Sequence, residues 1–413
     1  MRRRLSVLYA CLVLVATGPV QAATPAFSNG VITGTIQTNL ITETSGLAAS
    51  RRNPGVLWLH NDSGDAPRLY AIDAAGNTLG IYTLTGAAAV DWEDMALATD
   101  PVDGVDYLYV GDIGDNTATR SSVEIYRVPE PVVSTNQSGL VTNLAGVSTY
   151  TLNYPDGAHN AETLLADPWS GDLIIVTKGD TPARIYRAPY PQSTGAVNTL
   201  QFSNTLSYAM PVGGSVAGSG RQILIKHYLS VLYYERQPGQ SVPDALTNTF
   251  AALPYTIEPQ GETVAWDARE RGYFTLSEKT SQPIYYYASA DTDGDGLVDS
   301  EEAGLGTDLD DADTDDDRQT DAEEVIAGTQ PTNATSFFTA DIQADGRGSL
   351  ALQWQARTNR VYDIERADFT NGMVFAPHAT GITFSTEQTA VTNLPADETP
   401  RAYRLRVRLQ TIW

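Results

Sequence analysis

Cysteine is nearly absent from this chain of 413 residues, which has one, Cys11, and only four histidines. Because Cys11 lies in an apolar segment near the N-terminus, we expect the rest of the chain to have no disulfide, catalytic thiol or cysteine metal site. Basic residues are also scarce: 26 Lys and Arg stand against 50 Asp and Glu, a net charge of −24. This charge argues against nucleic acid and anionic lipid surfaces as partners, since both are negative.

Long apolar runs are missing as well, apart from one near the N-terminus. The segment begins with three arginines, continues with an apolar run from Leu5 to Ala16, and ends in small residues at Ala22 and Ala23. This pattern is typical of a secretory signal peptide. A membrane anchor is the alternative, but the run is shorter than the roughly 20 residues that a membrane-spanning helix needs. We therefore expect residues 1–22 to be a signal peptide, and the protein to be secreted outside the cell, to the cell surface or into the periplasm.

Helical periodicity is not found between residues 27 and 289. Short apolar or aromatic runs recur there, separated by Gly, Pro, Asp and Asn, which is typical of an all-β fold. A longer repeat lies over this pattern. Each copy has a strand of small and apolar residues, a second strand that ends in polar residues, and a third with an Ile-Tyr or Leu-Tyr pair. Five copies begin at SGLAAS, WEDMALATD, AETLLADP, SVAGSG and GETVAWDAR.

Fourth strands are expected at TLGIYTL, VSTYTLNYP, TLQFSNTL and TNTFAALPY. The fifth copy has no such stretch after it, and GVITGTIQTN near the start of the chain would supply the missing strand and close a ring. This is the pattern of a β-propeller, in which four-stranded blades surround a central channel. We expect a five-bladed β-propeller over residues 27–289. A six-bladed propeller with one degenerate blade and a β-sandwich are the alternatives.

Several segments strengthen this interpretation by resemblance. ASRRNPGVLWLHNDSGD, DWEDMA, YVGDIGDN, NAETLLADPWSGDLIIVTK and GETVAW resemble a group of uncharacterised secreted bacterial propeller proteins. More distantly they are similar to phytase-like and esterase-like propellers. The resemblance covers most of residues 45–289, and it implies a fold rather than an activity.

Blade topology predicts where polar side chains meet. The first strand of a blade lines the channel and the second runs antiparallel beside it, so the start of one and the end of the other share a face. The aligned starts are Ser45, Glu93, Glu162, Ser215 and Glu262. The aligned ends are His60, Asn61, Asp62, Asp112, Asp115, Lys178, His227 and Glu278. Titratable groups from all five blades would therefore converge on one mouth of the channel.

The candidate catalytic residues at this mouth are Glu93, Glu162, Glu262, His60, Asp112, Lys178 and His227. Crowded carboxylates have raised pKa values unless a cation compensates, and such a cluster marks a candidate functional site. Lys178 or a divalent metal in the channel would be that cation. His159, Asp91 and Asp94 are expected close by. A purely structural role, in bonds between blades or to channel water, is the alternative for each residue.

Residues 291–324 contain the most specific motif, two consecutive loops with the ligand spacing of an EF-hand. The first has Asp291, Asp293, Asp295, Leu297, Asp299 and Glu302 at positions one, three, five, seven, nine and twelve. The second has Asp313, Asp315, Asp317, Gln319, Asp321 and Glu324 there, but Arg318 replaces the glycine at position six. Carboxylates at this spacing can converge on one Ca²⁺, so we expect two or more calcium ions. A disordered acidic linker is the alternative.

No helix of 10–12 residues is expected beside either loop, which departs from an EF-hand. EEAGLGTDLDDADTDDD and EEVIAGTQPTNATS resemble thrombospondin type 3 repeats, in which calcium makes up most of the core. The resemblance implies that Asp308 and Asp310 also bind calcium, and that residues 290–336 form a stiff, calcium-locked connector. Gln330 replaces the aspartate that a further ion would need.

Residues 337–413 again predict strands, at FFTADI, SLALQWQA, VYDIERAD, ITFSTEQTAVTNL and AYRLRVRL. The alternation in the last places Tyr403, Leu405, Val407 and Leu409 on one face. Six or seven strands in this length indicate a small β-sandwich, which resembles the fibronectin type III-like domains of secreted bacterial proteins. Trp354 and Tyr362 are expected in its core rather than on a sugar-binding surface.

Three functions remain open at this stage. The first is a secreted, monomeric, calcium-binding protein whose propeller recognises an extracellular ligand, such as a glycan or a cell-surface component. The second is a hydrolase that acts through the carboxylate-rich face, either metal-assisted on phosphoesters or esters, or glycan-degrading. The third is a structural surface protein. No GxSxG, HExxH or phosphate-cradling glycine loop is present, and this favours the first over the second.

Overall fold

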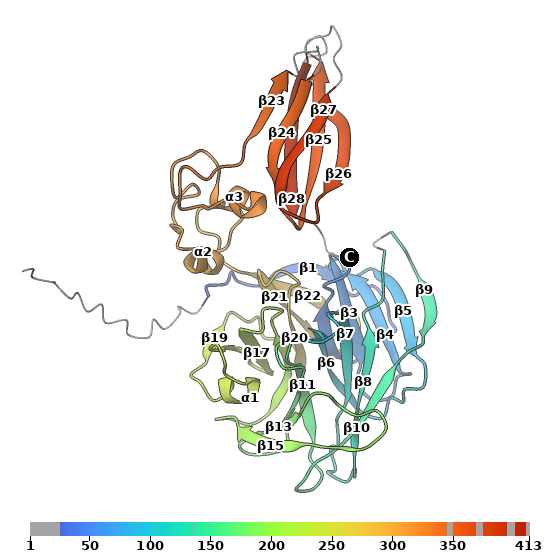
Figure 1. Ribbon diagram of the computed structural model, residues 1–413. Coiled ribbons are helices and arrows are strands. Elements are labelled where there is room, and N and C mark those ends of the chain that lie inside the picture. The colour runs from blue at the N-terminus through green and yellow to red at the C-terminus, as the bar shows by residue number, and fades with distance from the viewer. Residues whose placement is uncertain (1–24, 135, 345–349, 369–374, 395–400, 410–413) are drawn as a thin grey trace, which may run out of the picture.

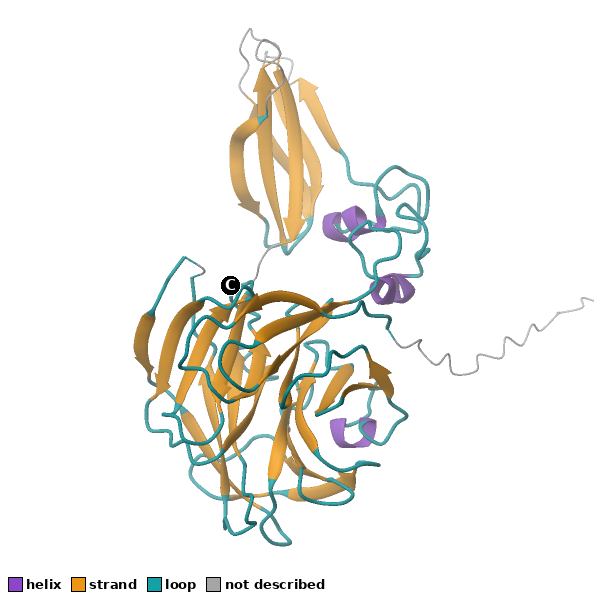
Figure 2. Cartoon of the chain, turned by 180° about the vertical axis from the view of Figure 1, so that it is seen from behind, coloured by secondary structure: helices purple, strands orange, loops and turns teal. Residues whose placement is uncertain are grey.

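The computed structural model describes residues 25–134, 136–344, 350–368, 375–394 and 401–409. The segment expected to be a signal peptide, 1–22, lies outside the described residues. Within them almost all regular structure is β-strand, so the predicted all-β class is confirmed. The strands form five sheets in one body and two sheets in a second, and Figures 1 and 2 show these bodies joined by a segment that contains the helices α2 (Asp299–Leu305) and α3 (Asp321–Ala327).

Five sheets repeat one plan, in which strands follow one another in chain order and pair antiparallel. The first sheet has β2 (Thr44–Ala49), β3 (Val56–Asn61), β4 (Arg68–Asp73) and β5 (Thr78–Leu84). The second has β6 (Trp92–Thr99), β7 (Asp106–Asp112), β8 (Val123–Pro129) and β10 (Ser148–Asn153). The third has β11 (Ala161–Ala166), β12 (Leu173–Thr177), β13 (Arg184–Ala188) and β15 (Gln201–Thr205). The fourth has β16 (Pro211–Val216), β17 (Gln222–His227), β18 (Ser230–Glu235) and β19 (Ala251–Leu253).

The fifth sheet takes its outer strand from the other end of the domain. It has β20 (Gly261–Trp266), β21 (Gly272–Ser277) and β22 (Pro283–Ala288), and β1 (Val31–Thr35) pairs antiparallel with β22. The expectation that a strand near the start of the chain completes the last sheet is therefore confirmed. Two short strands, β9 (Leu140–Leu144) and β14 (Asn198–Thr199), add parallel edges to the first and second sheets, and a short helix α1 (Val242–Ala245) follows β18.

The first strands of the five sheets pack against one another. β2 contacts β6, β6 contacts β11, β11 contacts β16, β16 contacts β20, and β20 contacts β2. Five clusters of buried apolar residues lie between successive sheets. Leu164 and Ile175 of the third sheet, for example, pack with Tyr109 and Ile125 of the second. Each sheet therefore buries both of its faces against its two neighbours.

One first strand differs from its predicted position. The fourth copy was expected to begin at Ser215, but β16 begins at Pro211, four residues earlier. Glycines hide this strand in the sequence and allow its close packing. A Cβ at Gly213 would lie 2.5 Å from the Glu262 carbonyl oxygen, and a Cβ at Gly214 would lie 2.7 Å from a methyl group of Leu165.

The segment between the two bodies has two helices of one and a half to two turns, α2 (Asp299–Leu305) and α3 (Asp321–Ala327). Each begins at position nine of an expected calcium loop and ends at a left-handed glycine, Gly306 or Gly328. Both helices are shorter than those of an EF-hand, as expected. No helix among the described residues is long and apolar enough to cross a membrane.

The C-terminal module has six described strands in two three-stranded sheets that share one core. They are β23 (Ala340–Ala344), β24 (Leu350–Ala356), β25 (Arg360–Asp368), β26 (Ala376–Thr383), β27 (Gln388–Leu394) and β28 (Arg401–Leu409). The stretch 382–394 is divided between the end of β26 and β27, with residues 384–387 between them. Trp354 and Tyr362 lie in the core as expected, whereas Leu409 at the end of β28 is exposed.

The apolar clusters between sheets predict the effect of a core truncation. Leu164 is fully buried between the second and third sheets, so Leu164→Ala removes buried methyl groups and leaves a cavity. We expect it to lower the free energy of unfolding by about 2–5 kcal/mol, measured by urea denaturation. Val102→Ala, at a side chain that is 78% exposed, is the control and should change stability by less than about 0.5 kcal/mol. Equal effects of the two variants would contradict the packing.

Candidate functional site

The same β-bulge occurs in all five sheets, near the start of the first strand. Each time, one extra residue of the first strand is inserted opposite the end of the second strand. The inserted residues are Ser45, Glu93, Glu162, Val212 and Glu262. A bulge changes the direction of the side chain at the inserted residue. Because the bulge is repeated, Glu93, Glu162 and Glu262 occupy equivalent positions in their sheets. The predicted alignment is right in four sheets and wrong in the fourth.

Val212 and not Ser215 occupies the fourth position, because the bulge follows Pro211. Ser215 lies near the other end of β16, where its hydroxyl accepts a hydrogen bond from the Trp266 backbone N–H at 3.2 Å. Ser215 therefore joins the fourth and fifth sheets and does not belong to the site.

A second set of equivalent positions lies one residue beyond the last pair of each second strand. These positions hold Asp62, Ile113, Lys178, Tyr228 and Glu278. In the fourth sheet the sequence alignment chose His227, one residue too early, and missed Tyr228. The strand pairing places His227 opposite Pro211, so Tyr228 is the first residue after the last pair. The sequence alone does not show where the bulge lies.

The carboxylates at these positions, together with Asp91, form an acidic cluster, defined here as Asp62, Asp91, Glu93, Glu162, Glu262 and Glu278. Burial and the surrounding carboxylates, Glu162 first among them, raise the pKa of Glu93 well above its usual value. Burial raises the pKa of Glu162 to about 7, although Lys178 opposes the shift. Burial and Glu262 raise the pKa of Glu278 to about 8. The cluster thus contains more negative charge than its own cations neutralise.

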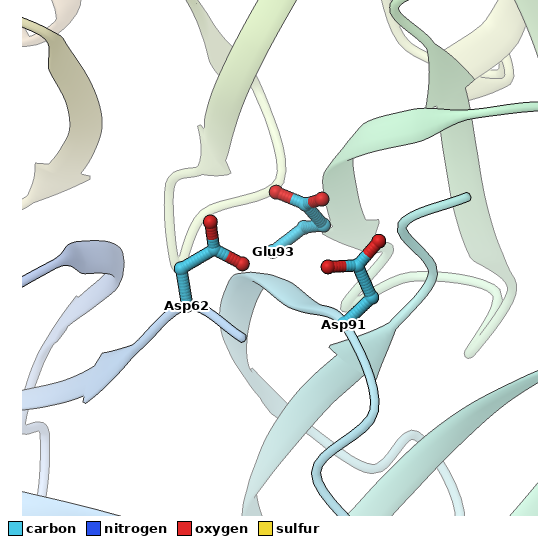
Figure 3. Close-up of side chains that lie close together, drawn as sticks. All are labelled: Asp62, Asp91 and Glu93. Carbon is cyan, nitrogen blue, oxygen red and sulfur yellow. The ribbon is translucent and has the colours of Figure 1, made fainter. Parts of the chain in front are cut away.

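Asp62, Asp91 and Glu93 lie at the centre of this excess charge. Figure 3 shows their three carboxylates turned toward a common space, Asp62 from the end of β3 and the other two from the start of β6. One oxygen from each lies within 4.8 Å of the others. Burial raises the pKa of Asp62 to about 6. Hard divalent cations take such oxygen sets, so these three residues can hold a metal ion.

The loop after β7 supports this group of three. Asp112 is fully buried and accepts hydrogen bonds from the backbone N–H groups of Val90 and Asp91 at 3.0 and 3.1 Å. Arg120 pairs with Asp112 at 2.7 Å. Asp112, a predicted catalytic residue, therefore fixes the backbone around Asp91.

The other side of the cluster is a chain of polar contacts. Lys178 pairs with Glu162 and donates a hydrogen bond to the Tyr228 hydroxyl at 2.9 Å. That hydroxyl donates in turn to Glu262 at 2.7 Å. Lys178 thus occupies its predicted position and carries the positive charge of this side.

The predicted histidines differ in their surroundings. His60 is fully buried against Trp92, and burial lowers its pKa to about 4. His227 is partly buried, and burial together with Lys226 lowers its pKa. His159, expected beside Glu162, instead contacts Asp180 at 2.9 Å.

Asp94 has a structural role. Its fully buried carboxylate accepts hydrogen bonds from the backbone N–H groups of Leu164 and Gly214 at 2.9 and 3.1 Å. It therefore joins the first strands of the second, third and fourth sheets. Burial raises the pKa of this carboxyl well above its usual value.

The two acidic loops have closely similar local geometry. Asp291, Asp293 and Asp295 bring carboxylate oxygens within 4.8 Å of one another, and so do Asp313, Asp315 and Asp317. At position nine, Asp299 and Asp321 accept hydrogen bonds from the backbone and hydroxyl of Thr292 and Thr314, respectively. Position nine of an EF-hand loop often acts through a water molecule, which is compatible with these bonds.

Position twelve carries the most informative side chains. Glu302 and Glu324 are fully buried, and both carboxylate oxygens of each lack a hydrogen-bond donor among the described residues. Burial and the neighbouring aspartates raise the pKa of each to about 7. A buried carboxylate without a donor is strongly unfavourable unless a cation or a proton compensates.

The remaining predicted calcium ligands have other surroundings. Leu297 at position seven is buried, whereas the Gln319 side chain makes two hydrogen bonds with the Phe338 backbone at 2.7 and 2.8 Å. Asp308 and Asp310 are exposed, and their carboxylates belong to neither group of three.

Comparison with known proteins does not assign the chain. A scan against models of protein families finds no match, and a search among curated proteins finds no similar sequence.

Glu162 gives a pH-dependent prediction. Its folded-state pKa of about 7 lies above the ordinary 4.5, so between these values the folded state keeps a proton that the unfolded state has released. Stability therefore falls as pH rises through this window, by about 1.4 kcal/mol per pKa unit at most. Glu162→Gln cannot ionise, and we expect its free energy of unfolding to fall less between about pH 5 and pH 7. Glu235→Gln is the control, and equal slopes for wild type and Glu162→Gln would contradict the prediction.

Proposed function

We propose that this protein is a secreted, calcium-binding protein whose two acidic loops each take up a Ca²⁺ ion. The observation that carries the proposal is the pair Glu302 and Glu324, which bury four oxygens without a donor among the described residues. Both stand at position twelve, where an EF-hand glutamate binds calcium with two oxygens. Three aspartates converge beside each. A hard cation of the size of calcium compensates these charges, and calcium is plentiful outside cells.

The role of calcium in this proposal is to fix one part of the chain against the next. Arg271 of the fifth sheet donates to the Gly296 carbonyl at 2.6 Å and pairs with Glu301 at 3.0 Å. The Ala322 backbone N–H donates to Asp295 at 2.7 Å, which couples the two loops. Arg360 of the C-terminal module donates to the Val325 carbonyl at 2.9 Å. Calcium in both loops would hold this series of contacts rigid.

The five-sheet domain is, in this proposal, a five-bladed β-propeller. Three observations support it: the cyclic contacts of the first strands, the apolar cluster between every two neighbouring sheets, and the completion of the last sheet by β1. In a propeller, an outer strand supplied by the other end of the domain ties the first and last blades together. The C-terminal module resembles a fibronectin type III-like sandwich, in keeping with an extracellular monomer.

The acidic cluster is the proposed recognition site of this domain, for an extracellular ligand such as a glycan or a cell-surface component. Lys178 and Tyr228 support it, since they offer a cation and a hydroxyl beside carboxylates.

The second candidate is a metal-assisted hydrolase of phosphoesters or esters, and the group Asp62, Asp91 and Glu93 favours it. Glycan arrays and a phosphoester and ester substrate screen, both with the full chain, separate the two.

The calcium loops lead to a direct test. We expect Glu302→Gln or Glu324→Gln to weaken one calcium-binding step by about tenfold or more, because each removes one charge and one of two ligating oxygens. Isothermal titration of the chelator-treated full chain measures this. Glu323→Gln is the matched control, since Glu323 is exposed, neighbours Glu324 and caps α3 in a way that glutamine also can.

Small-angle scattering tests the connector. Chelation should increase the radius of gyration of the wild-type chain as 290–336 expands, while the far-ultraviolet circular dichroism of the strands stays the same. A radius of gyration that does not respond to chelator, or an unchanged titration in both glutamate variants, would refute the proposed function.

A further inference from the structure

The strongest unassigned feature of the five-sheet domain is the group Asp62, Asp91 and Glu93. Each offers one oxygen, and the three oxygens lie within 4.8 Å of one another. Ligands on opposite sides of a calcium ion are separated by about 4.6–5.2 Å, because each Ca–O distance is about 2.3–2.6 Å. The spacing of the group therefore fits around one such ion.

Glu93 provides an independent observation that points to a ligand. It is 3% exposed, and no described residue donates a hydrogen bond to its carboxylate or forms an ion pair with it. Figure 3 shows this carboxylate turned into the space that Asp62 and Asp91 also face. A buried carboxylate so placed needs a positive partner.

The nearby protein cations are already engaged. Arg120 pairs with Asp112 at 2.7 Å and donates to the Gly114 carbonyl at 2.8 Å. Lys178 pairs with Glu162 and bonds to Tyr228. Among the described residues, no basic side chain forms an ion pair with the three carboxylates, so a cation that compensates them would come from outside the chain.

The backbone around the group is built to leave this space. A Cβ at Gly114 would lie 2.2 Å from a Glu93 oxygen and 2.5 Å from the Asp91 carboxyl carbon. Glycine is therefore required where the loop after β7 passes the two carboxylates. Asp112 holds the backbone that presents Asp91, and the β-bulge aims Glu93.

We propose that Asp62, Asp91 and Glu93 bind one hard divalent cation, with Ca²⁺ as the physiological ion, at the end of the channel between the first strands. The set contains oxygen ligands only, which suits Ca²⁺ rather than Zn²⁺ or copper. Calcium takes six to eight oxygens, so three carboxylates leave positions open for water or for a ligand oxygen. This site deepens the proposed recognition at the acidic cluster, and it is independent of the two calcium loops.

The open positions determine the chemical class of ligand. Outside this group of three, the charges of Glu162 and Glu262 raise the pKa of Glu93. Glu162 pairs with Lys178, and Glu262 accepts a hydrogen bond from the Tyr228 hydroxyl. A ligand with an anionic oxygen can bind the cation and approach the ammonium group and the phenol together. Carboxylate- and phosphate-bearing molecules share this chemistry.

The test counts calcium ions in the full chain. Wild type, Glu93→Gln and Glu43→Gln are stripped with chelator, equilibrated against the same free calcium concentration, and analysed for bound calcium per chain by mass spectrometry. Glu43 is exposed beside the same cluster, so Glu43→Gln removes an equal charge without removing a ligand. We expect Glu93→Gln to hold one ion fewer than wild type and Glu43→Gln to match wild type.

Two further arms make each outcome decisive. The double variant Glu302→Gln with Glu324→Gln should keep the ion held by Glu93, so that failure of the calcium loops and failure of this site are distinguished. In chelator, Glu93→Gln should melt at or above the wild-type temperature, because it removes a buried charge. If Glu93→Gln does not fold, Asp91→Asn is used in its place as the variant that lacks one ligand of the ion. Equal calcium content in wild type and in the folded variant, or an equal loss in Glu43→Gln, would overturn the proposal.

Discussion

The pairing of β1 with β22 is the contact on which the rest of the structure depends. It joins residues about 250 positions apart, as in the bond from Thr33 to the Ile284 carbonyl. The acidic cluster is assembled by the same closure, since Asp62 comes from the first sheet and Glu278 from the fifth. The backbone N–H of Lys279 donates to the Thr42 carbonyl at 2.8 Å where these sheets meet. Closing so long a loop has a large entropic cost, which the apolar cluster between the first and fifth sheets offsets. The first acidic loop starts at Asp291, three residues after β22, and the Ala290 backbone N–H donates to the Ala26 carbonyl at 2.9 Å. A rigid loop at this point would therefore also stabilise the closure.

Negative charge is the second constraint, and it acts in the same way in two unrelated places. In the acidic cluster and in the two loops, carboxylates are buried beside one another with too few donors and too few basic residues. Such groups are tolerated only when protonated or when bound to a cation. The pKa of Glu162, Glu302 and Glu324 rises to about 7 in each case, so burial and repulsion alone bring them to the edge of protonation. Cations from the surroundings therefore belong to the proposed function in both places, as structure in the loops and as part of a binding surface in the cluster.

Most of the strand plan could be predicted from the sequence, because aliphatic and aromatic runs such as those of β3, β7 and β12 recur with turn residues between them. The closing role of β1 followed from counting strands.

What could not be predicted depends on backbone detail. β16 is made of Pro, Val, Gly and Ser, so it has no apolar run, and its glycines are explained only by the neighbours that they touch. Val212 was missed because the start of β16 was placed four residues too late, and Tyr228 was missed because the end of β17 was placed one residue too early. His60 was placed at the site because its polarity was visible and its burial was not. In the loops, the spacing identified the aspartates, whereas the exposure of Asp308 and Asp310 depends on how the segment folds back.

The repeated bulge explains how an almost symmetric framework produces a directional site. Equivalent backbone positions in five sheets carry Ser45, Glu93, Glu162, Val212 and Glu262, and the adjoining set carries Asp62, Ile113, Lys178, Tyr228 and Glu278. If all five sheets had the same residues, any ligand on the axis would meet the same charge from every direction. Instead the first and second sheets each supply one carboxylate beside an uncharged residue, the third supplies a glutamate and the lysine, the fourth supplies a phenol and an apolar side chain, and the fifth supplies two glutamates. A cation held by Asp62, Asp91 and Glu93 would accordingly lie off the axis, on the side of the first two sheets and next to the third sheet, which carries Lys178. The difference between sheets, rather than the repeat itself, thus gives a bound molecule one preferred orientation.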